Sequence, residues 1–314
     1  MARYAVRVSA PRRLSRETVL VGCGLLVIYV VWGSVYVAIR YVVEDVPALL
    51  SIGVRYVVAG ALLAAYVVAR LGPGVLRASR KALGGCLLLA ILLQVLTNGT
   101  VTWAEGAGLQ AGPAALLTAL APIAIVLLRL GTGDRPRAVT WVGVVVGFAG
   151  LAVLLLGGRS VPGFPLGPSM IVVASAGCWA VGSFLQPRLL LPDDTFVTAA
   201  YQLLLGGVVL TVAGLVGGER TTFDFRLSTW LVLAFLTASS VVSYTTYVWL
   251  LRHAPISLVS THAYVNPVVA VLLGWMWLGE PITWPVVLGG AVVLVAVGLV
   301  MAERRRLPDE PPVA

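Results

Sequence analysis

The sequence predicts an all-α membrane protein with ten transmembrane helices, arranged as two inverted five-helix repeats. Of its 314 residues, 59% are hydrophobic and only 11% are charged, whereas about a quarter of the residues of a soluble domain are charged. Apolar runs of about 20 residues, long enough to cross ~30 Å of hydrocarbon, follow one another from Val19 to Ala302. These runs are continuous rather than alternating, which predicts helices instead of barrel strands.

Short polar turns separate the apolar runs and set the expected spans. We place the ten spans at residues 19–39, 47–69, 82–104, 111–128, 138–156, 168–186, 195–217, 229–250, 256–278 and 282–302. The expected organisation is therefore a basic N-terminus (1–18), a first five-helix repeat (19–156), an outer linker (157–167), a second five-helix repeat (168–302) and a short proline-rich tail (303–314).

The basic residues predict the orientation. If the N-terminus is cytoplasmic, seventeen of the 22 Lys and Arg residues lie in inner segments, four lie outside, and Arg55 lies within a span. The positive-inside rule then puts both termini in the cytoplasm of a multi-pass protein of the inner membrane. The first apolar run is too long for a signal peptide and lacks a small-x-small cleavage site, so we expect it to be retained as a span.

The two halves of the chain match each other. At an offset of about 147, Trp32 aligns with Trp179 and Arg55 with Gln202; at about 145, residues 121–128 align with 266–273. Because each half has an odd number of spans, the second copy must enter the membrane in the opposite sense. Inverted repeats are typical of secondary transporters, whose substrate site lies near the midplane between the repeats.

Four segments also carry a resemblance to a known family. WGSVYVAIR (32–40), VRYVVAG (54–60), residues 98–123 and residues 264–281 resemble the EamA family of the drug/metabolite transporter (DMT) superfamily. The resemblance covers essentially the whole chain and implies a central cavity and export of amino acids, other metabolites or toxic compounds. Family members commonly have a second acidic position where this chain reads residues 133–136, so a symmetric role for Glu280 is in doubt.

Spans 1 and 6 each present one polar and aromatic helix face. Trp32 and Tyr36 share a face of span 1, while Trp179 and Ser183 share a face of span 6. We expect these residues to line a substrate cavity where the two faces meet. The alternatives are anchoring of Tyr36 in the outer interfacial belt and hydrogen bonding of Ser183 to its own helix.

Arg55 lies inside span 2, where a charge is costly unless it is paired or hydrated. It either anchors a carboxylate or phosphate of the substrate or forms a structural ion pair with Glu44, Asp45 or Glu105, and the sequence slightly favours the ion pair. Its repeat equivalent, Gln202, keeps hydrogen-bonding capacity without the charge.

The end of span 3 is unusually polar. Asn98 and Trp103 are expected to face the cavity, and Glu105 is the acidic candidate for proton coupling. For Glu105 the sequence favours the simpler alternative, an exposed carboxylate at the end of the helix.

Spans 8 and 9 add further candidates for the cavity. Tyr244 and Tyr247 lie on a polar aromatic stripe of span 8, while His262 and Asn266 share a face of span 9. His262 either titrates with a coupling proton or, as is more usual, is a neutral histidine hydrogen-bonded between helices.

Prolines and cysteines complete the candidate residues. Pro122 and Pro267 occupy matching mid-span positions and predict helix breaks at the midplane. Cys23, Cys86 and Cys178 lie singly in apolar runs, which supports neither a disulfide framework nor a metal site.

The function predicted from these patterns is secondary export of amino acids, related small metabolites or amphiphilic toxic compounds by alternating access. The sequence contains no G-x-x-x-x-G-K-[ST] motif, and we expect no cofactor and no nucleic-acid partner. The expected partners are a small-molecule substrate, membrane lipids and a coupling proton, and no oligomeric state is predicted. The alternatives are a polytopic enzyme acting on lipid-linked substrates and a passive solute channel.

Overall fold

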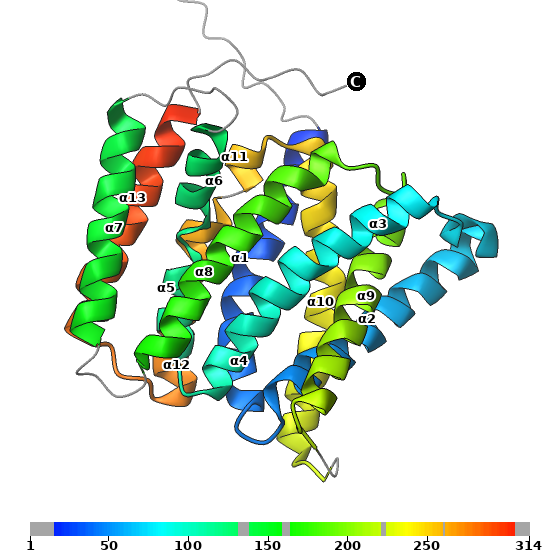
Figure 1. The fold of residues 1–314 in the computed structure, drawn as a ribbon, viewed down its shortest axis with the longest axis horizontal. Helices are drawn as coiled ribbons and strands as arrows, with labels where there is room; N and C mark the ends of the chain where they lie inside the picture. Colours follow the sequence, from blue (N-terminus) through cyan, green and yellow to red (C-terminus); the bar gives the residue numbers. More distant parts are fainter. Residues whose placement is uncertain (1–15, 131–137, 159–163, 221–223, 260, 305–314) are drawn as a thin grey trace, which may run out of the picture.

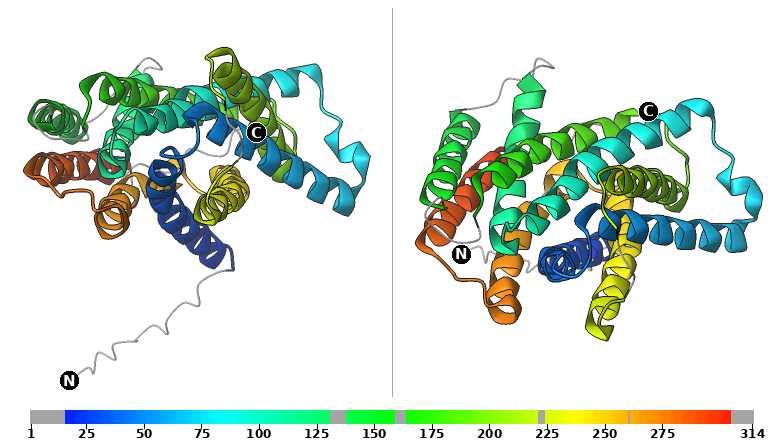
Figure 2. Two further views of the ribbon diagram at one scale, coloured as in Figure 1. Left: turned by 90° about the horizontal axis from the view of Figure 1, so that it is seen from below. Right: turned by 60° about the horizontal axis from the view of Figure 1, so that its bottom comes forward.

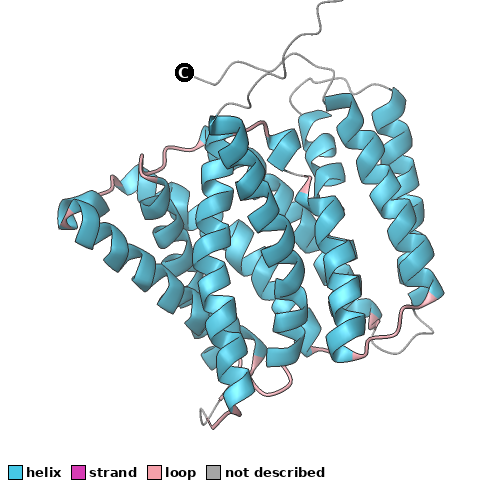
Figure 3. Cartoon of the chain, turned by 180° about the vertical axis from the view of Figure 1, so that it is seen from behind, coloured by secondary structure: helices cyan, strands magenta, loops and turns pink. Residues whose placement is uncertain are grey.

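The structure is a computed structural model that describes residues 16–130, 138–158, 164–220, 224–259 and 261–304. All regular secondary structure in these ranges is helical (Figure 3). Eight helical stretches are long and apolar enough to cross a membrane, and two shorter apolar stretches, Val265–Leu278 and Trp284–Leu299, bring the described total to about ten. The chain is thus an all-α, multi-pass membrane protein, as predicted. The predicted N-terminal segment and tail lie almost wholly outside the described residues, as does the turn at 133–136.

The first repeat runs from α1 to α7 (Figure 1). Its helices are α1 (Arg16–Val42), α2 (Ala48–Leu71), η1 (Pro73–Leu76), α3 (Arg80–Leu89), η2 (Ala90–Gly99), α4 (Thr100–Gly106), α5 (Ala111–Thr118), α6 (Ala121–Leu130) and α7 (Ala138–Gly158). Span 3 is therefore continuous from α3 to α4 but is π-helical over η2. Long π-helical segments are rare and frequently occur at functional sites.

The second repeat runs from α8 to α13. Its helices are α8 (Leu166–Leu185), η3 (Gln186–Arg188), α9 (Thr195–Val216), α10 (Leu227–His253), α11 (Ile256–Val259), α12 (His262–Leu278) and α13 (Trp284–Arg304). Polar side chains set some of these starts: Asp194 accepts hydrogen bonds from the backbone N–H groups of Phe196 and Val197 at the start of α9.

Spans 4 and 9 are both interrupted, but at different points. In span 4 the helix breaks at Ala119 and Leu120, directly before Pro122 in the first turn of α6. In span 9, Pro267 lies inside α12, and the break comes earlier, between α11 and α12.

Equivalent helices of the two repeats pack against each other. α2 packs along α9, and α7 packs along α13. In Figure 1 the α7–α13 pair forms one edge of the bundle, while α2, α3 and α9 lie at the opposite edge. The views in Figure 2 show α1, α10 and α12 between these two groups. The bundle therefore has two tightly packed seams, α2–α9 and α7–α13, and helices from both repeats lie between them.

Glycines bring α2 and α9 into backbone contact. A Cβ on Gly207 would lie 2.6 Å from the Val57 backbone nitrogen and 2.8 Å from the Gly53 carbonyl oxygen. A Cβ on its repeat equivalent, Gly60, would lie 2.8 Å from the Leu204 backbone nitrogen. Small residues let membrane helices approach this closely. The seam is thus built from reciprocal contacts of matching positions.

Candidate functional site

A cavity lies between the two repeats, and both of them contribute residues to its wall. It holds about 880 Å³ of empty space, including the part that is open to solvent. Its walls come from α1, α2, η2, α4, α5, α6, α8, α10 and α12. Eight of the predicted cavity residues line it: Trp32, Tyr36, Arg55, Asn98, Trp179, Tyr244, His262 and Asn266; Pro267, predicted as a helix break, also lines it.

Four rings form a cluster at one end of this cavity. The ring centroid of Trp32 lies 5.4 Å from that of Trp179, 5.0 Å from Tyr247 and 5.0 Å from His262. Trp179 and His262 meet Trp32 edge to face, an arrangement that aromatic rings prefer. Trp32 and Trp179 are repeat equivalents, so spans 1 and 6 meet here through matching residues.

Tyr247 belongs to the ring cluster, but neither Tyr247 nor its partner Ser183 is part of the cavity wall. Their hydroxyl groups are hydrogen-bonded at 2.8 Å and both side chains are buried. Ser183 thus bonds to another helix rather than to its own. This bond fixes the Tyr247 ring against Trp179, 5.3 Å away between centroids.

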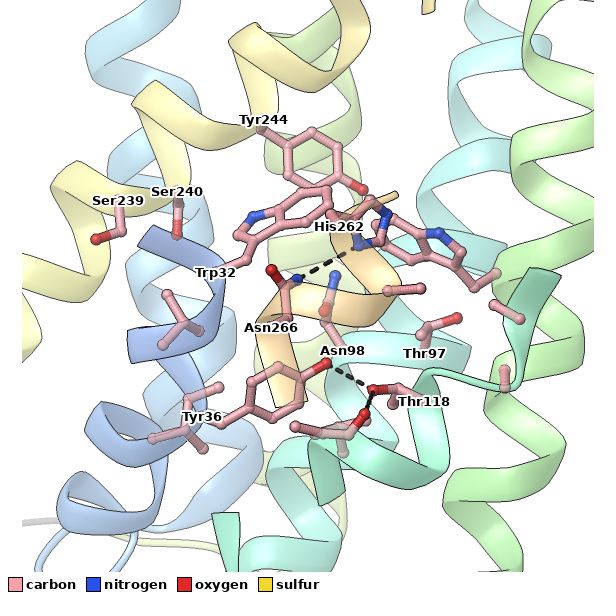
Figure 4. A pocket seen from close by; sticks show the side chains of 18 of the residues that line it. Trp32, Tyr36, Thr97, Asn98, Thr118, Ser239, Ser240, Tyr244, His262 and Asn266 are labelled. Atoms are coloured by element: carbon pink, nitrogen blue, oxygen red, sulfur yellow. Dashed lines mark hydrogen bonds between the residues drawn. The ribbon is translucent and has the colours of Figure 1, made fainter. Parts of the chain in front are cut away.

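Span 1 approaches α12 at Gly33. A Cβ there would lie 2.5 Å from Cβ of Val269, so the glycine admits the neighbouring helix. At the start of α12 the side-chain amide of Asn266 lies 3.3 Å from Nδ1 of His262 (Figure 4). With its nitrogen facing the backbone, this amide donates to the carbonyls of Tyr29 and His262. The histidine is therefore held by its own helix.

Polar groups surround the middle of the cavity. Asn98 Nδ2 donates to the Leu93 carbonyl at 2.9 Å and to Oε1 of Gln94 at 3.2 Å. The first of these bonds joins residues five apart, the same separation as the backbone hydrogen-bond partners of the π-helix η2. In Figure 4, Asn98 and Asn266 lie between the ring cluster and Tyr36.

Tyr36 crosses from α1 to α5 rather than anchoring in an interfacial belt. Its hydroxyl lies 2.7 Å from Oγ1 of Thr118 (Figure 4). Because the Thr118 hydroxyl donates its own proton to the Ala115 carbonyl, Tyr36 is the donor in this pair. Thr118 is a cavity residue that the sequence analysis did not select.

Among the described residues of the cavity wall, Arg55 is the only one with a fixed charge, and His262 is titratable. Its side chain is buried, and its guanidinium carbon lies 5.1 Å from the ring centroid of Tyr56. The favoured structural ion pair is absent among the described residues: Glu44 pairs with Arg40 at 3.6 Å, and Asp45 pairs with Arg226 at 2.9 Å.

Glu105 is buried, contrary to the favoured expectation of an exposed carboxylate. It is 0% exposed, and neither carboxylate oxygen has a hydrogen-bond partner among the described residues. It lies in the last turn of α4, against which α1 and α2 pack. Glu105 does not line the cavity, although the charges of Arg40, Arg55 and Glu280 act on it.

Two other predicted residues also lie outside the cavity wall. Trp103 is 39% exposed, on the outer face of α4. Gln202 is fully buried within α9, and neither atom of its amide has a hydrogen-bond partner among the described residues. Pro122 follows the helix break in span 4 but does not reach the cavity.

Two carboxylates of the second repeat hold helix starts of the first. The Glu219 oxygens accept from the backbone N–H groups of Leu49 (3.1 Å) and Leu50 (2.8 Å), at the start of α2. The Glu280 oxygens accept from Ala111 (2.9 Å) and Gly112 (3.4 Å), at the start of α5. An anion at a helix N-terminus is stabilised by the free N–H groups there. Both helices line the cavity, so these contacts position its walls.

The surroundings of Glu280 and Asp45 shift their pKa values in opposite directions. Burial raises the pKa of Glu280, and the two backbone hydrogen bonds oppose this only in part. The hydrogen bond from Thr229, followed by that from Arg226, lowers the pKa of Asp45. Asp45 therefore stays ionised to lower pH than an ordinary aspartate. Glu280, on the same side of the bundle, is protonated more easily than an ordinary glutamate.

Comparisons with known proteins agree with this architecture. Residues 20–156 and 167–302 each match the EamA-like transporter family. The chain is 35% identical over 291 residues to the uncharacterized inner membrane transporter YedA of Escherichia coli strain K12, covering 92% of this chain and 93% of that one. It is 22% identical over 286 residues to the uncharacterized transporter YoaV of Bacillus subtilis, covering 88% and 94%. A solved crystal structure shares the fold with a TM-score of 0.65 at 21% identity, covering 93% of this chain and 99% of the other.

Proposed function

Because the chain belongs to the EamA-like transporter family, we propose that it is a secondary transporter that exports amino acids, related small metabolites or amphiphilic toxic compounds from the cytoplasm. Transport proceeds by alternating access across the inner membrane. The observation that supports this function best is the cavity between the two repeats, bounded at one end by rings that equivalent helices contribute.

The cavity wall suits a medium-sized, partly apolar solute. Trp32, Trp179 and Tyr244 offer ring faces, while Asn98 and Asn266 offer amide groups. Such a combination of apolar surface and few polar groups is typical of small-molecule sites. Opening of the ring cluster would connect the cavity to the opposite side of the membrane.

Proton coupling is assigned to Glu105 and, secondarily, to His262. Glu105 is a buried carboxylate without a hydrogen-bond partner among the described residues, and it lies within electrostatic range of Arg55. Ionisable groups placed in this way within spans are typical of proton relays.

Metabolite profiling of the growth medium tests export directly. Cells overproducing the wild-type protein are compared with empty-vector cells and with cells producing Trp179→Ala or Trp103→Ala at equal membrane abundance. We expect a defined solute to accumulate with the wild type and with Trp103→Ala, because Trp103 does not line the cavity. Trp179→Ala should reduce the accumulation strongly. A medium indistinguishable from that of empty-vector cells would contradict export.

A further inference from the structure

Arg55 places one fixed positive charge in a cavity wall whose other described polar residues are neutral or titratable. Arg55 is 5% exposed and lines the cavity, and its Nε has no hydrogen-bond partner among the described residues. The other polar lining residues in the described wall are tyrosine, tryptophan, threonine, serine, asparagine and histidine side chains. The site therefore has one fixed cation and no fixed anion in its wall.

The carboxylates nearest in sequence do not neutralise Arg55. Glu44 and Asp45 each pair with another arginine. Glu105 acts on Arg55 electrostatically but forms no salt bridge with it, and its oxygens lie buried outside the cavity wall. A guanidinium without a counter-ion in direct contact is costly inside a membrane protein. A charge kept under these conditions is typical of a site whose counter-ion comes with the ligand.

The wall around Arg55 also limits the ligand. The Tyr56 ring lies beside the guanidinium, 5.1 Å from its carbon, and restricts its orientation. The planar guanidinium of Arg55 can pair with one carboxylate through two parallel hydrogen bonds. A second negative charge on the ligand would have no further fixed cation among the described lining residues. The aromatic rings of Trp32, Trp179 and Tyr244 complete an apolar wall for the rest of the ligand.

We propose that Arg55 binds the carboxylate of an organic substrate that carries a single carboxylate on an apolar or aromatic body. Zwitterionic amino acids belong to this class, and dicarboxylates and organic cations do not. The proposal rests on the proposed transport function and narrows its substrate class.

Binding of three related probes to the purified full-length protein tests this assignment. Isothermal titration is carried out with 3-phenylpropanoate, with L-phenylalanine and with L-phenylalaninamide, which lacks the carboxylate. We expect the two carboxylates to bind the wild type and the amide to bind much more weakly. Arg55→Gln, which copies the repeat-equivalent Gln202, should weaken carboxylate binding by about 30-fold or more, as when one partner of a buried charge pair is removed.

Two further variants separate binding from folding. Arg70→Gln removes an arginine from the same helix but outside the cavity wall, where Arg70 lies beside Tyr66, and should bind the carboxylates as the wild type does. Arg55→Lys keeps the charge but loses the bidentate fork, so its affinity should fall between those of the wild type and Arg55→Gln. Thermal melting of each unliganded variant shows whether it is folded.

Several outcomes would overturn the assignment. They are failure of both carboxylates to bind the wild type at millimolar concentration, equal binding of the amide, and unchanged carboxylate binding by a folded Arg55→Gln or Arg55→Lys. Export of a solute that has no carboxylate group in the metabolite experiment would also overturn it while leaving the transport function intact. Carboxylate binding that depends on Arg55, without export of any solute, would instead contradict the transport function.

Discussion

At the scale of single residues, Glu280 shows how burial and capping compete. Its carboxylate accepts two backbone hydrogen bonds at the start of α5, which favour the ionised form. Burial favours the neutral form and is the larger effect, so the pKa of Glu280 lies above its ordinary value of 4.5. The folded state thus holds this proton to higher pH than the unfolded state does.

This shift predicts a pH dependence of stability. Because the folded pKa is raised, the stabilisation linked to Glu280 is complete below about pH 4.5 and is lost as the pH rises through the folded pKa. Glu280→Gln removes this titration. We therefore expect the melting temperature of the wild type, measured relative to Glu280→Gln, to fall as the pH is raised from 4.5 to 7.5. A difference that stays constant, or grows in favour of the wild type, would contradict the prediction.

The environment of Glu105 could not be predicted at this scale. In the sequence it stands directly before the Gly-rich segment 106–112, which favours exposure. In the structure, α1 and α2 pack against α4, and Glu105 is buried. The contacts of the Glu219 and Glu280 carboxylates could not be predicted either, because they join residues about 170 positions apart in the sequence.

At the scale of elements, the α2–α9 seam depends on glycine at matching positions. A methyl group on Gly207 would meet the backbone of α2, which cannot move aside as a flexible side chain can. The two helices would have to separate, and overpacking of this kind costs roughly 1–3 kcal/mol.

We accordingly expect Gly207→Ala to lower the melting temperature of the purified protein and its yield in the membrane. Gly177→Ala in α8 is the matched control, because no atom beyond its chain neighbours and the nearby backbone of α8 lies within 4 Å of the added methyl group. There alanine should leave stability unchanged or raise it, by at most about 1 kcal/mol, through its better helix propensity. Equal effects of the two substitutions would show that the seam is not closely packed.

The π-helix η2 is the element that sequence periodicity missed. An α-helical period puts residues three and four apart on one face, but the backbone hydrogen bonds of a π-helix join residues five apart, so the faces of η2 differ from those that an α-helical period predicts. Thr97 and Asn98 both line the cavity. Thr97 also donates to the Ser175 carbonyl of α8, so η2 is held by a neighbouring span that no local pattern reveals.

At the scale of the whole molecule, hydropathy and internal repetition were sufficient to predict the fold class. Apolar runs must become helices in a bilayer, and two copies with five spans each must be inverted. The same alignment paired Trp32 with Trp179, and these rings are in contact. The details of the cavity depend instead on which spans meet in three dimensions. For that reason Thr118 was missed and Trp103 was included.

The orientation of the bundle leads to a prediction of its own. The distribution of Lys and Arg predicts that residues 43–47 and 217–226 lie outside the cell and that the C-terminus lies inside. A fluorescent protein fused to the C-terminus should fluoresce, whereas alkaline phosphatase fused there should be inactive. Phosphatase fused after Gly218 should be active. The reverse pattern would show that the bundle is inserted in the opposite sense.

The ring cluster at the end of the cavity also has an optical consequence. Two of the nine tryptophans of the chain, Trp32 and Trp179, lie edge to face in it, against Tyr247 and His262. A transport cycle that opens this end must separate the two indoles and change their polarity and their mutual orientation. Emission wavelength and near-ultraviolet circular dichroism would then follow the opening of the protein directly, without an attached dye.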